Sequence, residues 1–218
     1  MTIPVISAHE AAQVTYDSRA LRFRLLGVLP LLFFTAHFIF YWTAPFYSTN
    51  RGIDNMLWMC NVGNLLLGIG LLTGVKWITR MATVWLIPGL PLWLFEVVRN
   101  GGWLFTSFLT HIGGLIVAIF AISKIRAGKW SWAHALVWYL VMQLLSWAFT
   151  SPYWNVNVAH RIYGGYETVV SEYWQFWALT TAMVAAGLWV LGFILWKLFP
   201  LYTGEVMWRE KQPQLNTD

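Results

Sequence analysis

The chain has 218 residues, of which 58% are hydrophobic and 11% charged, and its formal net charge is +5. Soluble domains carry about 25% charged residues, so the composition indicates an integral membrane protein. The cations fall in short segments between apolar runs, without a basic stripe and interleaved aromatics, so the charge does not indicate nucleic-acid binding. The single cysteine, Cys60, excludes an internal disulfide and a CxxC metal site, and we expect neither a metal nor a cofactor.

Six apolar runs come close to the roughly 20 residues that span a bilayer as a helix. In chain order they cover about 24–45, 55–74, 80–98, 103–123, 131–150 and 174–199. A longer connection, 151–173, precedes the last run, and no repeat or second domain is visible. We therefore predict an all-α fold, with residues 1–218 forming a single bundle of six transmembrane helices.

The lysines and arginines are distributed unequally between the two sides that six spans define. One side holds eleven of them: Arg19, Arg22, Arg24, Lys76, Arg80, Lys124, Arg126, Lys129, Lys197, Arg209 and Lys211. The other side holds three: Arg51, Arg99 and Arg161. Because cytoplasmic loops carry the excess of Lys and Arg, we place both termini in the cytoplasm and expect a bacterial cytoplasmic (inner) membrane protein.

This topology places the unusual intramembrane polar residues in the outer half of the bilayer. At 1.5 Å per residue, Cys60 lies about 8 Å and His111 about 12 Å below the outer ends of their helices. Ionisable groups at such depth usually face a bundle interior or a water-filled cavity. We therefore expect a polar pocket that opens outward, covered by the 151–173 connection. Its other candidate lining residues are Asn61, Asn64, Glu96, Asn155, Asn157 and His160.

Cys60 and His111 are the candidates for chemistry in this pocket. A buried cysteine is more often a small inert hydrophobe, but a neighbouring imidazole converts a thiol into a nucleophile. His111 is the best partner for Cys60 by depth, and Ser107 lies one turn before it on the same helix face.

The other polar residues have structural alternatives. Asn61 and Asn64 serve equally well as links between helices or as donors to an oxyanion or a headgroup. Glu96 and Arg99 are spaced to form an interfacial ion pair. The polar residues of the 151–173 connection are ordinary for a loop, although the connection is long for so compact a protein.

Four consecutive segments also resemble a known family. They are "MLWMCNVGNLLLGIGLLTG", "MATVWLIPGLPLWLFEVVRNGG", "WLFTSFLTHIGGLIVAIFAI" and "QLLSWAFTSPYWNVNVAHRIYGGY", followed by a final apolar span. Over residues 25–199 this order resembles the YwaF-like group of integral membrane proteins, which includes transmembrane protein 164 and is distantly related to the androgen-induced-gene hydrolases. The resemblance implies acyl transfer on phospholipids, with Cys60 as the nucleophile and His111 as its base.

The leading hypothesis is therefore acyl transfer to or from a membrane lipid, or its hydrolysis, through a thioester. His111 takes the proton of Cys60, and the thiolate attacks an ester carbonyl. Asn64 or a donor from the 155–160 segment stabilises the oxyanion, and His160 or Glu96 orients the imidazole or the headgroup.

Two other classes stay open. One is a non-enzymatic membrane protein that binds a lipid, a quinone or a metal as a carrier or assembly partner. The other is a haem protein with His37 and His111 as axial ligands. The sequence names no protein partner.

Overall fold

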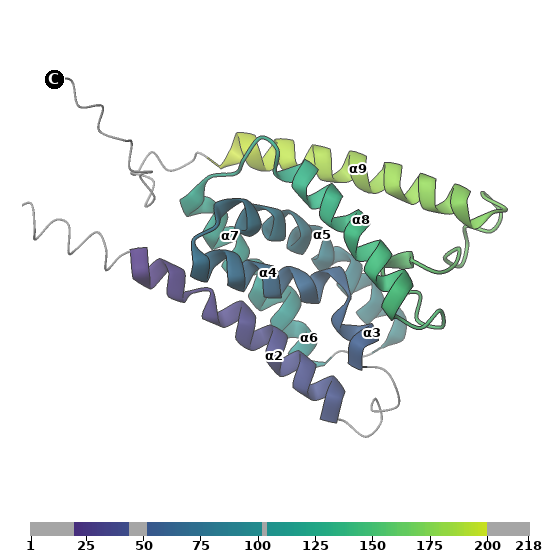
Figure 1. The fold of residues 1–218 in the computed structure, drawn as a ribbon, viewed down its shortest axis with the longest axis horizontal. Helices are drawn as coiled ribbons and strands as arrows, with labels where there is room; N and C mark the ends of the chain where they lie inside the picture. Colours follow the sequence, from purple (N-terminus) through teal and green to yellow (C-terminus); the bar gives the residue numbers. More distant parts are fainter. Residues whose placement is uncertain (1–19, 44–51, 102–103, 200–218) are drawn as a thin grey trace, which may run out of the picture.

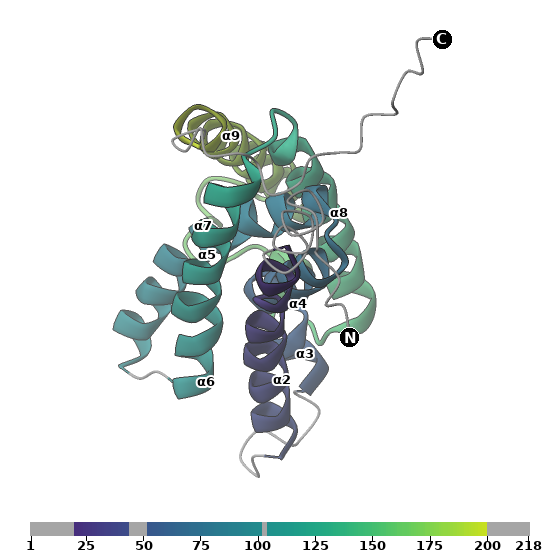
Figure 2. The ribbon, with the colours of Figure 1, turned by 90° about the vertical axis from the view of Figure 1, so that its left-hand side faces the viewer.

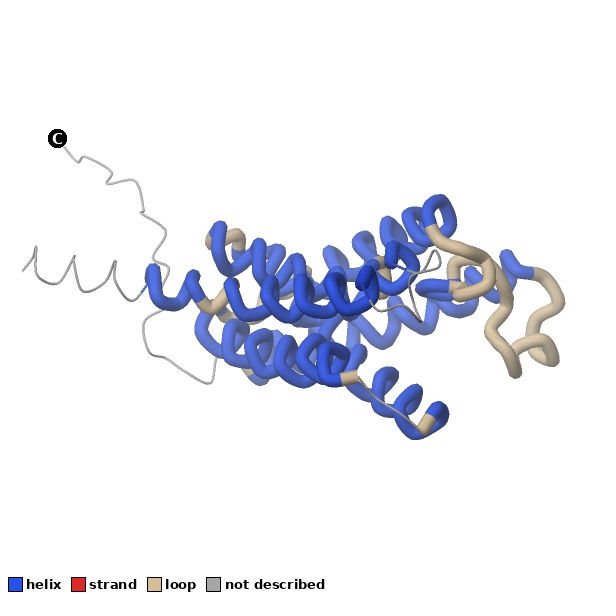
Figure 3. Tube along the Cα trace, turned by 90° about the horizontal axis from the view of Figure 1, so that it is seen from below, coloured by secondary structure: helices blue, strands red, loops and turns tan. Residues whose placement is uncertain are grey.

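The structure is a computed structural model that describes residues 20–43, 52–101 and 104–199, and every regular element in these ranges is helical (Figures 1 and 3). Five helices are long and apolar enough to cross a membrane. They are Ala20–Thr43, Lys76–Arg99, Phe105–Ile125, Ser131–Phe149 and Tyr173–Leu198. The prediction of an all-α fold is thus confirmed for the described residues, with five helices that could cross a membrane.

The first of these helices is interrupted by a turn near its start. Residues 20–25 are helical, a turn follows at Leu26 and Gly27, and α2 continues as Val28–Thr43. Pro30 explains the turn, because it has no N–H to donate to the carbonyl of Leu26 four residues earlier. That carbonyl instead accepts a hydrogen bond from the Leu29 N–H at 3.1 Å.

The second expected span is broken and shorter than predicted. It forms α3, Gly52–Met56, and then α4, Met59–Thr73. With 15 residues, α4 is about 22 Å long, against about 30 Å of bilayer hydrocarbon. It is the most enclosed helix of the bundle, since nine of its residues are buried: Met59, Asn61, Val62, Gly63, Asn64, Leu67, Gly68, Gly70 and Leu71. Helix α4 therefore packs against protein on most of its surface.

The remaining elements agree with the expected spans to within a few residues. They are α5 (Lys76–Asn100), α6 (Phe105–Phe108), the π-helical turn η1 (Leu109–Gly113), α7 (Gly114–Ile125), α8 (Ser131–Phe149), η2 (Val156–Val158) and α9 (Tyr173–Leu198). Helices α8 and α9 lie along one side of the bundle and α2 along the other, with α4, α5 and α7 between them (Figures 1 and 2).

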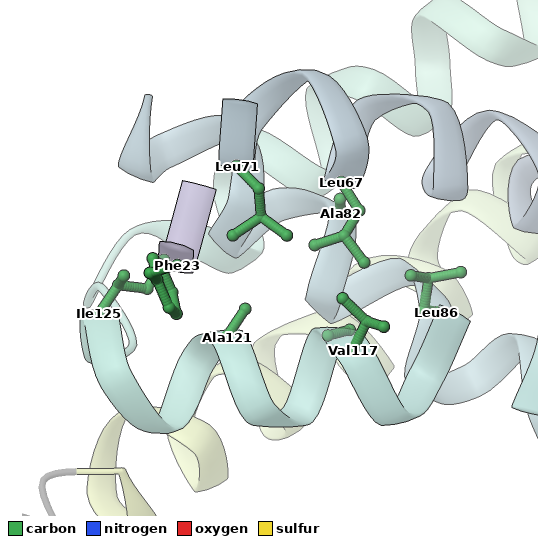
Figure 4. Packing of buried hydrophobic residues seen from close by; sticks show 9 residues of the cluster. Phe23, Leu67, Leu71, Ala82, Leu86, Val117, Ala121 and Ile125 are labelled. Carbon is green, nitrogen blue, oxygen red and sulfur yellow. The ribbon is translucent and has the colours of Figure 1, made fainter. Parts of the chain in front are cut away.

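The core lies where α4, α5 and α7 meet (Figure 4). Its buried side chains are Phe23, Leu67, Leu71, Ala82, Leu86, Val117, Ala118, Ala121 and Ile125. Small residues on α5 and α7 face leucines on α4, and this allows the three helices to approach closely.

The bundle has two distinct ends. The loop end carries Gly101, Leu104 and the segment 150–172, and the turn end carries the short connections 74–75 and 126–130. The start of the described chain at residue 20 and the end of α9 both lie at the turn end (Figure 1). Arg19, Arg51, Arg209, Lys211, residues 44–45 and 103 of the predicted spans, and both chain termini lie outside the described residues.

Helices α2 and α4 approach each other at two glycines, which yields a stability prediction. A Cβ on Gly68 would lie 2.5 Å from Leu31 Cγ and 2.9 Å from the Gly27 carbonyl oxygen. We expect Gly68→Ala to destabilise the protein by about 1–3 kcal/mol through this overlap. Gly187 on α9 has no atom within 4 Å of an added Cβ, so Gly187→Ala is the control. The free energy of unfolding of both variants is measured in detergent. An equal loss in the two variants would contradict the close packing of α2 on α4.

Candidate functional site

The site is organised by η1, where the helix that carries His111 widens by one residue. The N–H of Gly114 bonds to the carbonyl of Leu109, five residues back, instead of to that of Thr110. The Thr110 carbonyl therefore loses its usual partner in the helix. The side-chain Nδ2 of Asn64 on α4 replaces that partner and donates to the Thr110 oxygen at 2.8 Å. π-Helical turns of this kind occur frequently at functional sites.

His111 is held in one orientation within this turn. Its Nδ1 lies 2.8 Å from the carbonyl oxygen of Ser107 and 3.5 Å from the Ser107 hydroxyl, so the predicted i, i+4 neighbours are in contact. A carbonyl only accepts, so Nδ1 carries the hydrogen of the neutral ring and Nε2 keeps its lone pair. The ring stacks on Trp93 of α5, with centroids 5.1 Å apart and planes inclined by 14°. His111 is 7% exposed, and in the described chain Nε2 has no hydrogen-bond partner.

His37 lies beside this arrangement, although the sequence analysis placed it only in the haem alternative. It is 4% exposed, and its Nδ1 lies 3.0 Å from the Thr106 hydroxyl. Thr106 and Ser107 are consecutive residues of α6, so one short helix positions both histidines. The environment of His37 depends on helix order around the bundle, which sequence spacing does not reveal.

Cys60 lies in the first turn of α4 and is partly buried. Its sulfur is 4.0 Å from Asn61 Oδ1. Its Cβ would be 3.6 Å from a Cβ built on Gly89 of α5.

Cys60 and His111 thus face successive turns of α5, because Gly89 and Trp93 are four residues, or about 6 Å, apart along the helix. Within the described residues no hydrogen bond joins the Cys60 sulfur to the imidazole of His111. The catalytic roles of Cys60 and His111 therefore stay predictions.

The two asparagines of α4 are engaged with backbone carbonyls. Nδ2 of Asn61 donates to the Asn55 carbonyl at 2.6 Å. Nδ2 of Asn64 donates to the carbonyls of Cys60 and Thr110 at 2.9 and 2.8 Å. Oδ1 of Asn64 has no hydrogen-bond partner and lies against the backbone of Gly114, where a side chain would overlap it. Asn64 therefore acts here as a link between α4 and η1.

The polar residues of the long connection tie it to the start of α4. Asn157 Oδ1 accepts the Met59 N–H at 3.2 Å, and its Nδ2 donates to the Leu57 carbonyl at 2.7 Å and to the Ser146 hydroxyl at 2.8 Å. The side chain thus satisfies backbone groups at the break between α3 and α4, as helix termini require. Asn157 has a φ of 52°, in the left-handed region that asparagine tolerates better than most residues.

Asn155 and His160 shape the same connection. Asn155 Oδ1 accepts the N–H groups of His160 and Arg161 at 2.9 and 3.1 Å, and its Nδ2 donates to the Arg161 carbonyl at 3.0 Å. The His160 ring bonds through Nε2 to the Ser146 carbonyl at 3.1 Å and to the Thr150 hydroxyl at 3.0 Å. These contacts anchor the connection to α8.

Glu96 and Arg99 meet through a third residue. The Tyr163 hydroxyl donates to Glu96 Oε1 at 3.3 Å and accepts from Arg99 Nη1 at 2.9 Å. Tyr163 therefore fixes the 151–173 connection to the end of α5, a role that the sequence spacing did not indicate.

A small cavity of about 10 Å³ lies at the turn end, lined by Phe23, Gly70, Leu71, Gly74, Lys76, Thr79 and Ile125. None of the predicted site residues lines it, and the polar pocket at the loop end stays a prediction. The described residues include no group of three or more His, Cys, Asp or Glu side chains able to hold a metal ion. In comparisons with known proteins, no family model, curated protein or solved structure matches the chain.

The link between α4 and η1 yields the second prediction. Asn64→Leu keeps the side-chain size but leaves the Thr110 carbonyl without a donor, and an unsatisfied buried carbonyl costs about 1–3 kcal/mol. We expect a loss of this size in unfolding free energy and a change in the environment of the His111 ring by NMR. Thr73→Val is the control, because the exposed Thr73 hydroxyl bonds only to the Ile69 carbonyl of its own helix. An unchanged His111 signal in Asn64→Leu would contradict the link.

Proposed function

We propose that this protein binds a hydroxyl-bearing lipid or quinol within the membrane, as a carrier or assembly factor, with His111 Nε2 as the recognising atom. The orientation of His111 carries the proposal. Since Nδ1 donates to the Ser107 carbonyl, Nε2 is a hydrogen-bond acceptor that suits a donor such as a hydroxyl. An oxidised quinone presents only carbonyl acceptors and fits this tautomer less well.

The use of the surrounding polar groups also favours binding. Most donors and acceptors of Asn61, Asn64, Asn155 and Asn157 already pair with other residues of the protein. His111 Nε2 has no such partner in the described chain. The adjacent Trp93 ring supplies an apolar face, as ligand sites with few polar contacts usually do.

Acyl transfer or hydrolysis through Cys60 is the second candidate. It is favoured by the position of Cys60 in the first turn of α4, facing Gly89 of α5 one helical turn from the Trp93 ring that stacks on His111. It also agrees with the resemblance to the YwaF-like group.

In this reaction Nε2 of His111 takes the thiol proton, and the sulfur bonds to the ester carbon as the lipid alcohol leaves with that proton. Water or a second alcohol then cleaves the thioester, and the thiol regains its proton. The thiol and the imidazole have to close the separation of one helical turn for the first step.

One experiment separates the two functions. Reconstituted protein is irradiated with a photoreactive diacylglycerol, which presents one free hydroxyl. We expect His111→Phe, which keeps a ring against Trp93 but loses the nitrogen, to reduce crosslinking about three- to tenfold, as the loss of one hydrogen bond predicts. Cys60→Ala should crosslink as the original chain does.

His134→Phe is the matched control, since His134 is exposed at the turn end and contacts Trp77. Equal crosslinking by His111→Phe and His134→Phe would refute the binding proposal. A hydroxylamine-sensitive acyl group acquired from a labelled phospholipid, and lost in Cys60→Ala, would establish the acyl-transfer alternative instead.

We also propose that α3 and α4 together form a sixth crossing, with both termini in the cytoplasm of a bacterium. In support, the described helices pass six times between the ends of the bundle if α3 with α4 and α6 with α7 each count as one pass, and the described basic residues concentrate at the turn end. In a Cys60→Ser background, a membrane-impermeant maleimide added to intact cells should label Val169→Cys at the loop end and not Lys197→Cys at the turn end. Labelling of Lys197→Cys and not of Val169→Cys would show that the turn end faces outward and would refute the proposed orientation.

A further inference from the structure

The described charges are segregated between the two ends of the bundle. The cations at the turn end are Arg22, Arg24, Lys76, Arg80, Lys124, Arg126, Lys129 and Lys197. Of the described cations, only Arg99 and Arg161 lie at the loop end. The four acids of the described residues, Asp54, Glu96, Glu167 and Glu172, all lie at the loop end, where they contact the 151–172 segment or begin α9. None of these four acids lies at the turn end, so the exposed cations Arg126, Lys129 and Lys197 have no carboxylate of the described chain beside them.

Arg126 is held at this end in a backbone conformation that glycine adopts far more readily. Its φ and ψ are 61° and 137°, a region that costs a non-glycine residue about 1–3 kcal/mol. Arg80 stabilises the turn, because its guanidinium donates to the carbonyls of Arg126 and Ile125 at 2.8 and 3.1 Å. The side chain of Arg126 is exposed and has no hydrogen bond in the described chain. The strain is thus tolerated at a position where the arginine side chain makes no hydrogen bond with the described chain.

Two further exposed cations accompany Arg126, each above an aromatic ring. The ammonium of Lys129 lies 5.5 Å from the Trp130 ring centroid, and that of Lys197 lies 4.5 Å from the Trp196 centroid. Ala127 and Leu195 belong to one buried cluster, and a Cβ on Gly192 of α9 would lie 2.7 Å from Trp132 Cβ, so the start of α8 after this turn packs against the last part of α9. Tryptophan beside lysine and arginine is the composition of a membrane interface at headgroup level.

We propose that the turn end binds the headgroups of anionic phospholipids, with Arg126, Lys129 and Lys197 contacting the lipid phosphates. The charge complementarity selects the occupant: clusters of cations next to membrane-spanning helices attract anionic lipids, and no acid of the described chain competes for them. This site lies at the opposite end of the bundle from His111 and does not depend on the function proposed for it.

The test uses the full chain in neutral phosphatidylcholine nanodiscs, with and without phosphatidylglycerol. Phosphatidylglycerol should raise the Tm of the original chain, and Arg126→Gln with Lys129→Gln should lose more than half of that increase. The charge-matched control, Arg99→Gln with Arg161→Gln, should keep it. Arg126→Gly adds a second signature: relief of the strained φ should raise Tm in neutral lipid, while loss of the cation reduces the response to phosphatidylglycerol.

Three results would overturn the proposal: no increase in Tm with phosphatidylglycerol, the same increase in the turn-end variant, or an equal loss in the loop-end control. Inorganic phosphate is added to the neutral nanodiscs as a separate arm. A rise in Tm with phosphate equal to that with phosphatidylglycerol would show a site for the free ion instead of a lipid headgroup.

Discussion

The hydrogen bond from Asn64 to the Thr110 carbonyl is the interaction on which the site depends. A membrane interior offers no water to a backbone carbonyl that has lost its helical partner, so the widened turn η1 requires a donor from another helix. Asn64 supplies that donor from α4, the most enclosed helix of the bundle. The widening in turn places the imidazole of His111 over Trp93 and directs Nδ1 to the Ser107 carbonyl. The orientation of one histidine thus rests on one carboxamide 47 positions earlier in the chain.

The polar residues of the loop end divide into those that build the fold and those that remain open to a ligand. Asn157 satisfies the backbone where α3 and α4 separate, and Asn155 and His160 fold the long connection onto α8. Their conspicuous polarity in an apolar chain follows from this structural role. Among the described residues, the imidazole Nε2 of His111 and the thiol of Cys60 are the reactive atoms left at the junction of α4, α5 and η1. A ligand bound there, or a reaction there, would depend on these two groups.

The turn end of the bundle is dominated by cations and short connections. Its connections are short, its helices end in cations, and its aromatic residues lie beside lysines. The strained backbone of Arg126 is stabilised by hydrogen bonds from Arg80, so a turn that glycine would form more easily instead presents an additional positive charge. The two ends thus differ in charge, in connection length and in the type of residue exposed.

The sequence by itself determined the helical class, the approximate limits of five long apolar helices and the unequal distribution of charge, because these follow from local hydropathy and composition. It also indicated the contact between Ser107 and His111, which depends only on helical spacing. Tertiary structure decided the rest. The break before Met59, the burial of α4 and the separation of Cys60 from His111 depend on how helices are ordered around the bundle. Likewise, Thr110 is distant in the chain from Asn64, and Leu57 and Met59 are distant from Asn157, so only packing brings these donors and acceptors together.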